Sequence, residues 1–212
     1  AMSKNNPSVR LMESIGTDYA INYAQRLGIG SPLSNDLTLA LGSSGVTLLE
    51  LTNAYAVFAR GGLLLEPILV KKVLDRDGNV LEDNPPHFKE LPEEVVKSSE
   101  GTIITDETWT QGRVISEQTA FIVTDLLRNV VEHGTGWRIK ALGRPAAGKT
   151  GTSEDFRDAW FIGFTPDLAA GVWVGLDTEA PLGKGESGAK AASPIWLEFM
   201  KDATRSMPLR DF

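Results

Sequence analysis

One stretch of the sequence carries two motifs whose chemistry differs. Residues 143–150 read GRPAAGKT and match G-x-x-x-x-G-K-[ST], the loop that cradles phosphates in nucleotide-binding proteins. The core of the same stretch, Lys149-Thr150-Gly151, is K-T-G, a motif of enzymes that form acyl-serine intermediates. The first interpretation predicts a nucleotide-binding protein, and the second predicts a protein that attacks amide bonds.

The residues that flank Lys149 favour the second interpretation. A phosphate-binding loop needs a helix that begins at its Lys-Thr pair, because the helix N-terminus holds the phosphates. Here Gly151 and the polar residues 153–155 lead into a predicted strand, and Pro145 removes one backbone N–H donor from the loop. K-T-G instead needs its lysine on an edge strand of an antiparallel sheet with more strands after it, and the sequence offers that context.

A second motif stands at the other end of the chain. Ser3-Lys4-Asn5 is S-x-N, which acyl-serine enzymes combine with K-T-G and S-x-x-K, and it directly precedes a predicted helix. Taken alone, these three residues would be an ordinary turn before a helix. The one S-x-x-K match, at residues 187–190, follows K-T-G in a glycine-rich loop, so we interpret it as a coincidence. We therefore expect the chain to lack the nucleophilic serine.

Helix and strand signals predict the elements that position these motifs. Helices are expected from an N-cap at Asn6 to Gly16, over about 18–27, from a capping box at Thr47 and Glu50, from Ser116 to about Glu132, and from Ser193 onward. Strands are expected over 68–74, 79–81, 146–152, 159–164 and 168–176. This order predicts an α+β fold in which helices cover an antiparallel β-sheet.

Two of these helices have apolar residues that we expect to form buried faces. They are Phe121, Ile122, Leu126, Val130 and Val131 on the fourth helix, and Ile195, Trp196, Phe199 and Met200 on the fifth. Residues 83–112 are polar, contain proline and lack periodicity, which predicts an inserted surface loop with little order.

Composition excludes several classes of function. The formal net charge of -7 and the lack of a basic stripe argue against a nucleic-acid partner. The chain has no cysteine, and His87 and His133 lie far apart in sequence, so we expect no metal site. No run of about 18 apolar residues occurs, which predicts no transmembrane helix within the chain.

Together the motifs and their surroundings resemble the C-terminal part of the transpeptidase domain of class A penicillin-binding proteins, the bifunctional kind that builds bacterial cell wall. The stretches that carry the resemblance are SKNNPSVRLMESIG, LALGSSGVTLLELTNAYAVFARGG, RVISEQTAFIVTDLLRNVVEHGTG and GKTGTSEDFRDAWFIGFTPDLAAGVWVG. The main exception, about 83–112, is a variable insertion in that family. The resemblance implies a penicillin-binding transpeptidase or serine β-lactamase-like fold, with residues 1–212 as a single partial domain that lacks its N-terminal part.

The resemblance also implies an activity. In this family a serine of S-x-x-K attacks the D-Ala-D-Ala amide of a peptidoglycan stem peptide, and an amine of a neighbouring stem resolves the acyl-enzyme. β-Lactams mimic the substrate and stop at the acyl stage. This implies a D,D-transpeptidase without a cofactor, on the extracytoplasmic side of the membrane, whose partners are stem peptides and β-lactams and whose membrane anchor lies outside these residues.

The motif positions imply a role for each residue. Ser3 would sit in the proton relay between nucleophile and leaving amine, Asn5 would bind the substrate's side-chain amide, and Lys149 would supply positive charge. The hydroxyls of Thr150 and Thr152 would bind the terminal carboxylate, and Gly151 would let the substrate backbone approach the strand.

Two further expectations follow from the missing nucleophile and the missing part of the domain. The chain is expected to be inactive alone, and an alternative of a different class is a non-enzymatic penicillin-sensing or interaction domain of the same fold. A β-lactamase would need a deacylating carboxylate, to which no motif points. Loss of neighbouring strands would expose a sheet edge, so we expect self-association.

Overall fold

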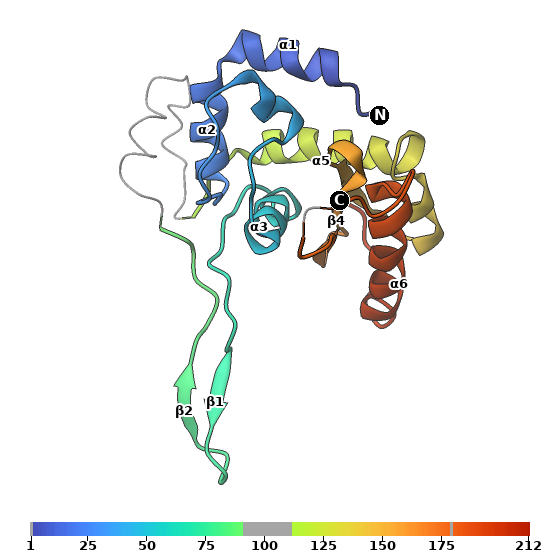
Figure 1. Cartoon of the computed structure of the whole chain (residues 1–212). Helices are drawn as coiled ribbons and strands as arrows, with labels where there is room; N and C mark the ends of the chain where they lie inside the picture. Colours follow the sequence, from blue (N-terminus) through green and yellow to red (C-terminus); the bar gives the residue numbers. More distant parts are fainter. Residues whose placement is uncertain (1, 91–111, 179) are drawn as a thin grey trace.

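A computed structural model of the chain describes residues 2–90, 112–178 and 180–212 (Figure 1). The helices in these residues are α1 (Asn5–Ile15), α2 (Thr17–Arg26), α3 (Leu48–Ala59), α5 (Glu117–His133) and α6 (Ser193–Ala203). Shorter helical segments are η1 (Leu37–Leu41), η2 (Trp137–Leu142), η3 (Glu154–Phe156) and η4 (Gly188–Ala192). The strands are β1 (Lys72–Leu74), β2 (Val80–Asp83), β3 (Ala147–Thr152), β4 (Ala159–Phe164) and β5 (Ala169–Val174).

The K-T-G strand is an outer strand of an antiparallel sheet, in the order β3-β4-β5. One face of the sheet packs on α6, where the rings of Phe161 and Trp196 meet edge to face at 5.2 Å. The other face packs on α3, and a Cβ atom on Gly171 of β5 would lie 2.9 Å from the Leu48 side chain. Figure 1 shows α3 and α6 on either side of β4. The predicted α+β fold is therefore confirmed, and Lys149 lies inside a strand rather than at a helix N-terminus, which excludes the phosphate-binding loop.

Two of the five described α-helices, α3 and α5, begin with a side-chain cap. The capping box before α3 is confirmed, because Thr47 Oγ1 accepts from Glu50 N at 3.1 Å and the Glu50 carboxylate accepts from Thr47 N at 3.2 Å. Gly16 ends α1 as predicted, with a φ of 83°. The predicted N-cap at Asn6 is wrong, because α1 already begins at Asn5, with Lys4 in the capping position and no side-chain cap.

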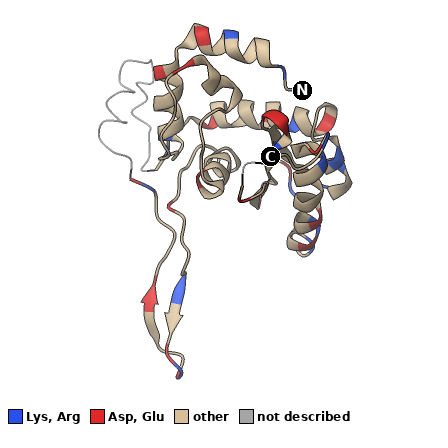
Figure 2. Ribbon diagram, viewed as in Figure 1, with Lys and Arg blue, Asp and Glu red and all other residues tan. Residues whose placement is uncertain are grey.

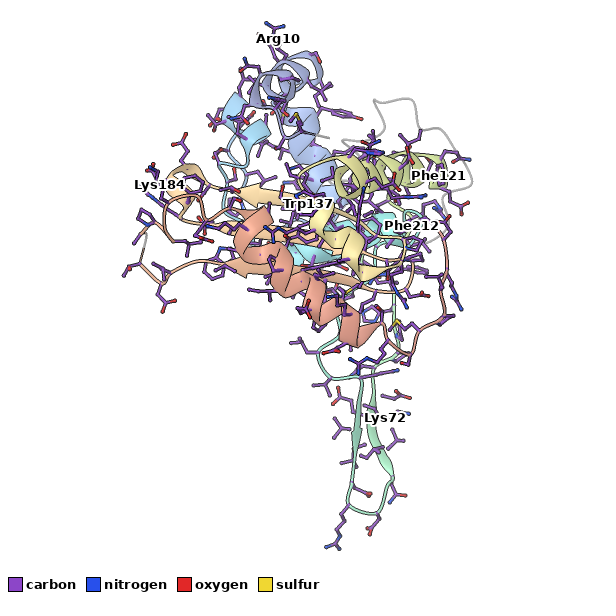
Figure 3. The ribbon with its side chains drawn as sticks, turned by 90° about the vertical axis from the view of Figure 1, so that its right-hand side faces the viewer. Arg10, Lys72, Phe121, Trp137, Lys184 and Phe212 are labelled. Carbon is purple, nitrogen blue, oxygen red and sulfur yellow. The ribbon has the colours of Figure 1, made fainter. Side chains whose placement is uncertain are left out.

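A hairpin of β1 and β2 projects from the body of the molecule, with Lys72 on the projecting part (Figures 1 and 3). Its arms continue to pair between the strands and the body of the molecule: Glu66 N donates to His87 O at 3.0 Å, and Lys89 N donates to Leu64 O at 3.2 Å. The prediction of a loop with little order is therefore wrong for residues 84–89, which return along 64–71. Most of that predicted insertion, residues 91–111, lies outside the described residues.

The apolar faces predicted for two helices are only partly buried. On α5, Phe121, which is labelled in Figure 3, has an exposed fraction of 60%, and Ile122 and Leu126 are similarly exposed. The buried side of α5 instead carries Ala120 and Thr124, besides the correctly predicted Val130 and Val131. Small side chains bring this helix close to its neighbours, so burial follows the small residues rather than the largest apolar ones.

A similar difference occurs on α6. Trp196 and Met200 are fully buried as predicted, whereas Ile195 and Phe199 are each 53% exposed. Lys and Arg are interspersed with Asp and Glu along this helix and on the hairpin (Figure 2). Among the described helices, none combines the length and the apolar character that crossing a membrane requires.

Candidate active site

The first residues of the chain meet the K-T-G strand at Lys149. The Lys149 Nζ atom donates one hydrogen bond of 3.2 Å to Ser3 Oγ and one of 2.6 Å to the Thr150 carbonyl oxygen. Ser3 is exposed and precedes α1, whereas Lys149 is half-buried on β3. Two motifs that lie 146 positions apart in the sequence are therefore side by side in space.

The environment of Lys149 is partly desolvated. Burial lowers the pKa of this lysine, because the charged form loses hydration. In the part of the chain that the structure describes, no carboxylate forms an ion pair with the ammonium group. An ammonium group in a partly desolvated position interacts more strongly with an anion than one in bulk water.

Asn5 lies two residues beyond Ser3 in the chain. It is the first residue of α1 and is exposed, and its side chain makes no hydrogen bond within the described residues. Together with Lys4, Asn6 and Pro7 it lines an open hollow of about 380 Å³. The amide of Asn5 is therefore available to a molecule that binds at the start of α1.

The two threonines of K-T-G-T differ in exposure and in partner. Thr150 is 8% exposed, and its Oγ1 lies 2.7 Å from Oγ1 of Thr135. Thr152 is exposed, and its Oγ1 accepts a hydrogen bond of 3.1 Å from Gly188 N. Thr135 and Gly188 are residues to which the sequence motifs assign no part in the site, although each touches a motif hydroxyl.

The close backbone approach that the structure records at Gly151 comes from within the chain. A Cβ atom on Gly188 would lie 2.4 Å from Gly151 O and 2.3 Å from Trp160 O, so η4 begins in direct contact with β3 and β4. A Cβ atom on Gly151 itself would lie 3.0 Å from Trp160 Cβ. The approach of a substrate backbone to Gly151 stays a prediction.

The chemistry of the site depends on hydroxyl, amide and ammonium groups. Among the described residues, no three His, Cys, Asp or Glu side chains cluster in a way that could hold a metal ion. His133 is exposed at the end of α5 with its Nε2 atom 3.8 Å from Glu132, and His87 lies on the hairpin arm beside Pro85. Neither histidine contacts Ser3 or Lys149.

Comparison with known proteins shows the family to which the chain belongs. The model of the penicillin-binding protein transpeptidase domain matches residues 1–201. Penicillin-binding protein 1A of Aquifex aeolicus is 39% identical over all 212 residues, and that of Pseudomonas aeruginosa is 35% identical over 98% of this chain. The crystal structure of penicillin-binding protein 1A from Haemophilus influenzae superposes with a TM-score of 0.84 at 32% identity and covers the whole chain.

These relatives are much longer than the chain. The 212 residues span 26% of the Aquifex aeolicus protein, 29% of the Pseudomonas aeruginosa protein and 34% of the Haemophilus influenzae chain. The likeness therefore concerns one part of each relative.

Proposed function

Because the chain belongs to the penicillin-binding protein transpeptidase domain family, we propose that it is the K-T-G-bearing part of a D,D-transpeptidase that cross-links peptidoglycan stem peptides. The observation that carries this proposal is the 3.2 Å hydrogen bond from Lys149 Nζ to Ser3 Oγ, which joins the two motifs across the chain. The protein would act on the extracytoplasmic side of the membrane, with its anchor outside these residues. β-Lactams would block it as substrate mimics.

The reaction proposed has two steps. A serine hydroxyl of an S-x-x-K motif adds to the carbonyl carbon of the D-Ala-D-Ala amide, the C–N bond breaks, and the serine proton is delivered to the departing D-Ala amine. An amine of a neighbouring stem then attacks the resulting ester. A new amide bond forms, the C–O bond to serine breaks, and the serine oxygen recovers a proton.

Ser3 and Lys149 are proposed to serve proton transfer in both steps. The Ser3 hydroxyl would pass the proton between the nucleophile and the nitrogen that leaves or attacks. Its oxygen accepts from Lys149, so the Ser3 proton is free to be donated. Asn5, with its side-chain amide unengaged in the described structure, would hydrogen-bond the acyl donor.

The residues after Lys149 are proposed to bind the acyl donor. Thr150 and Thr152 would donate their hydroxyl protons to its terminal carboxylate, whose charge Lys149 would attract. Side chains two positions apart on a strand point to the same face, so these two hydroxyls could act on one anion. Gly151, which has no side chain, would leave room for the donor backbone beside the strand.

The test is covalent labelling by a penicillin, read by intact mass. The full gene product that carries these residues is expected to gain the mass of one penicillin, with the adduct on a serine outside residues 1–212. The 212-residue chain alone is expected to gain none, because it holds no S-x-x-K motif before Ser3. A stable adduct on the isolated chain would contradict this assignment.

A pair of lysine variants makes the test specific to the site. In the full gene product, Lys149→Met should slow labelling by about 10²-fold, the loss typical of removing one group that stabilises developing charge. Lys140→Met, at an exposed lysine of η2, should label at the wild-type rate. If the wild-type protein is labelled but forms no cross-links from stem peptides, the penicillin-sensing alternative replaces the transpeptidase proposal.

A further inference from the structure

A hydroxyl outside the K-T-G motif touches the motif's own buried hydroxyl. Thr135 lies in the turn between α5 and η2, and its Oγ1 is 2.7 Å from Oγ1 of Thr150. Within the described residues, neither hydroxyl has a second hydrogen-bond partner. The contact is therefore a closed pair formed by two segments of the chain.

The number of protons in this pair limits what it can do. Each threonine hydroxyl has one proton and two acceptor lone pairs. One of the two protons lies between the oxygens, so the other must point away from the pair. If Thr135 donates, the outward proton belongs to Thr150; if Thr150 donates, the outward proton belongs to Thr135.

We propose that Thr135 is a positioning residue, which donates to Thr150 and so directs the Thr150 hydroxyl proton toward the carboxylate of the acyl donor. This inference rests on the proposed function. Thr152 is arranged by the same principle, because its oxygen accepts from Gly188 N and leaves its own proton to donate. Both motif hydroxyls are thus oriented from outside the strand, one by a side chain and one by a backbone amide.

The turn that carries Thr135 is well fixed for this role. The backbone N–H groups of Gly134 and Gly136 both donate to Val130 O, at 3.1 Å and 3.0 Å. A Cβ atom on Gly136 would lie 3.6 Å from the buried Phe161 ring, so the turn sits directly on the sheet core. A side chain held in such a turn fixes the rotamer of its hydrogen-bond partner, here Thr150. Consecutive hydrogen bonds that run in one direction also strengthen one another.

The experiment measures acylation of the full gene product by benzylpenicillin and by its methyl ester, which lacks the carboxylate charge. Thr135→Val keeps the shape of the side chain and removes the hydroxyl. We expect it to lower the second-order acylation rate with benzylpenicillin about five- to ten-fold, as for one lost bond in a chain that ends on a charge. The rate with the ester should stay within about two-fold, and Thr135→Ser, which keeps the hydroxyl, should behave as wild type.

The ratio of the two rates separates positioning from folding, because both rates are measured on the same preparation and the folded fraction cancels. Thr204→Val is the matched control: its buried hydroxyl bonds Met200 O at 2.7 Å on α6, and its loss should leave the ratio unchanged. If the wild-type protein is acylated and Thr135→Val has the same ratio of the two rates as the wild type, the positioning role alone is overturned. A wild-type protein that neither compound acylates overturns the proposed function as well.

Discussion

The contact between Gly188 and the K-T-G strand is close enough to predict the effect of a larger side chain. In Gly188→Ala, the new Cβ atom would lie 2.3 Å from Trp160 O and 2.4 Å from Gly151 O. An ordinary contact begins at 3.4 Å, so the atoms must separate by about 1 Å. Both obstacles are backbone atoms of paired strands, and neither can turn aside as a side chain would.

Two losses are expected from this substitution. Overpacking of this size costs about 1–3 kcal/mol, which corresponds to a fall in Tm of about 2–4 °C per kcal/mol for a domain of this length. The displacement also breaks the bond from Gly188 N to Thr152 Oγ1 and moves the strand that binds the acyl donor. A misplacement of about 1 Å at a reacting centre can cost about 10²-fold in rate. The acylation rate should therefore fall by more than the loss of folded protein would explain.

The assay is the second-order rate of labelling of the full gene product by a fluorescent penicillin, with Tm measured on the same samples. Gly45→Ala is the matched control, because no described residue other than its two chain neighbours has an atom within 4 Å of the Cβ position at Gly45. It should change neither quantity. If Gly188→Ala keeps both the wild-type Tm and the wild-type rate, η4 is not packed against β3 as described and the reasoning fails.

Three other properties of the protein can be tested by thermal melts and size-exclusion chromatography. Burial lowers the pKa of Lys149 below its value in the unfolded state, so the unfolded state binds more protons at alkaline pH. In thermal melts, the stability of the wild type should therefore rise relative to that of Lys149→Met as pH increases toward 10.5. The same pH dependence in both proteins would contradict the desolvation of Lys149. Hydrogen bonds from Ser31, Thr47 and Gly30 hold the pKa of Glu50 at about 2, so its contribution of about 1 kcal/mol, discounted for solvent screening, should be present above pH 4.5 and disappear as pH falls toward 2. Glu50→Gln should lower Tm at pH 7 by about 2–4 °C and little at pH 2, and equal losses at both pH values would disprove the charge dependence. The isolated 212-residue chain should self-associate through the outer edge of β5, which pairs with no further strand among the described residues. Elution as a stable monomer over a wide concentration range in size-exclusion chromatography would refute this.

The parts of the fold that the sequence predicts are those that short-range chemistry specifies. The capping box at Thr47 and Glu50, the N-cap at Ser116 and the end of α1 at Gly16 each depend on residues within four positions of one another. The three strands that follow Pro145 alternate with turn residues, so their antiparallel order could also be inferred. For a motif within one of these strands, such as K-T-G, the sequence alone then predicts a position on an antiparallel sheet.

The exposed side of α5 could not be predicted in this way. The helical period shows that Phe121, Ile122 and Leu126 gather on one face, but it does not say which face meets the sheet. In the described structure, the helix approaches its neighbours through Ala120 and Thr124, whose small size allows a short distance between elements. Which stripe is buried is a property of the partner surfaces, and these come from distant parts of the sequence.

The same limit applies to the candidate site, and it explains which residues the motifs identify. A motif identifies a segment whose own residues belong to the site, so the sequence could predict that Ser3 and Lys149 share one site. Thr135 and Gly188 act on the motif from two other segments, through one side-chain hydroxyl and one backbone N–H. A backbone N–H leaves no trace in residue type, and a single threonine in a turn is too common to indicate a partner. The direction of the two motif hydroxyls is consequently a tertiary property, fixed where the turn after α5 and the start of η4 meet β3.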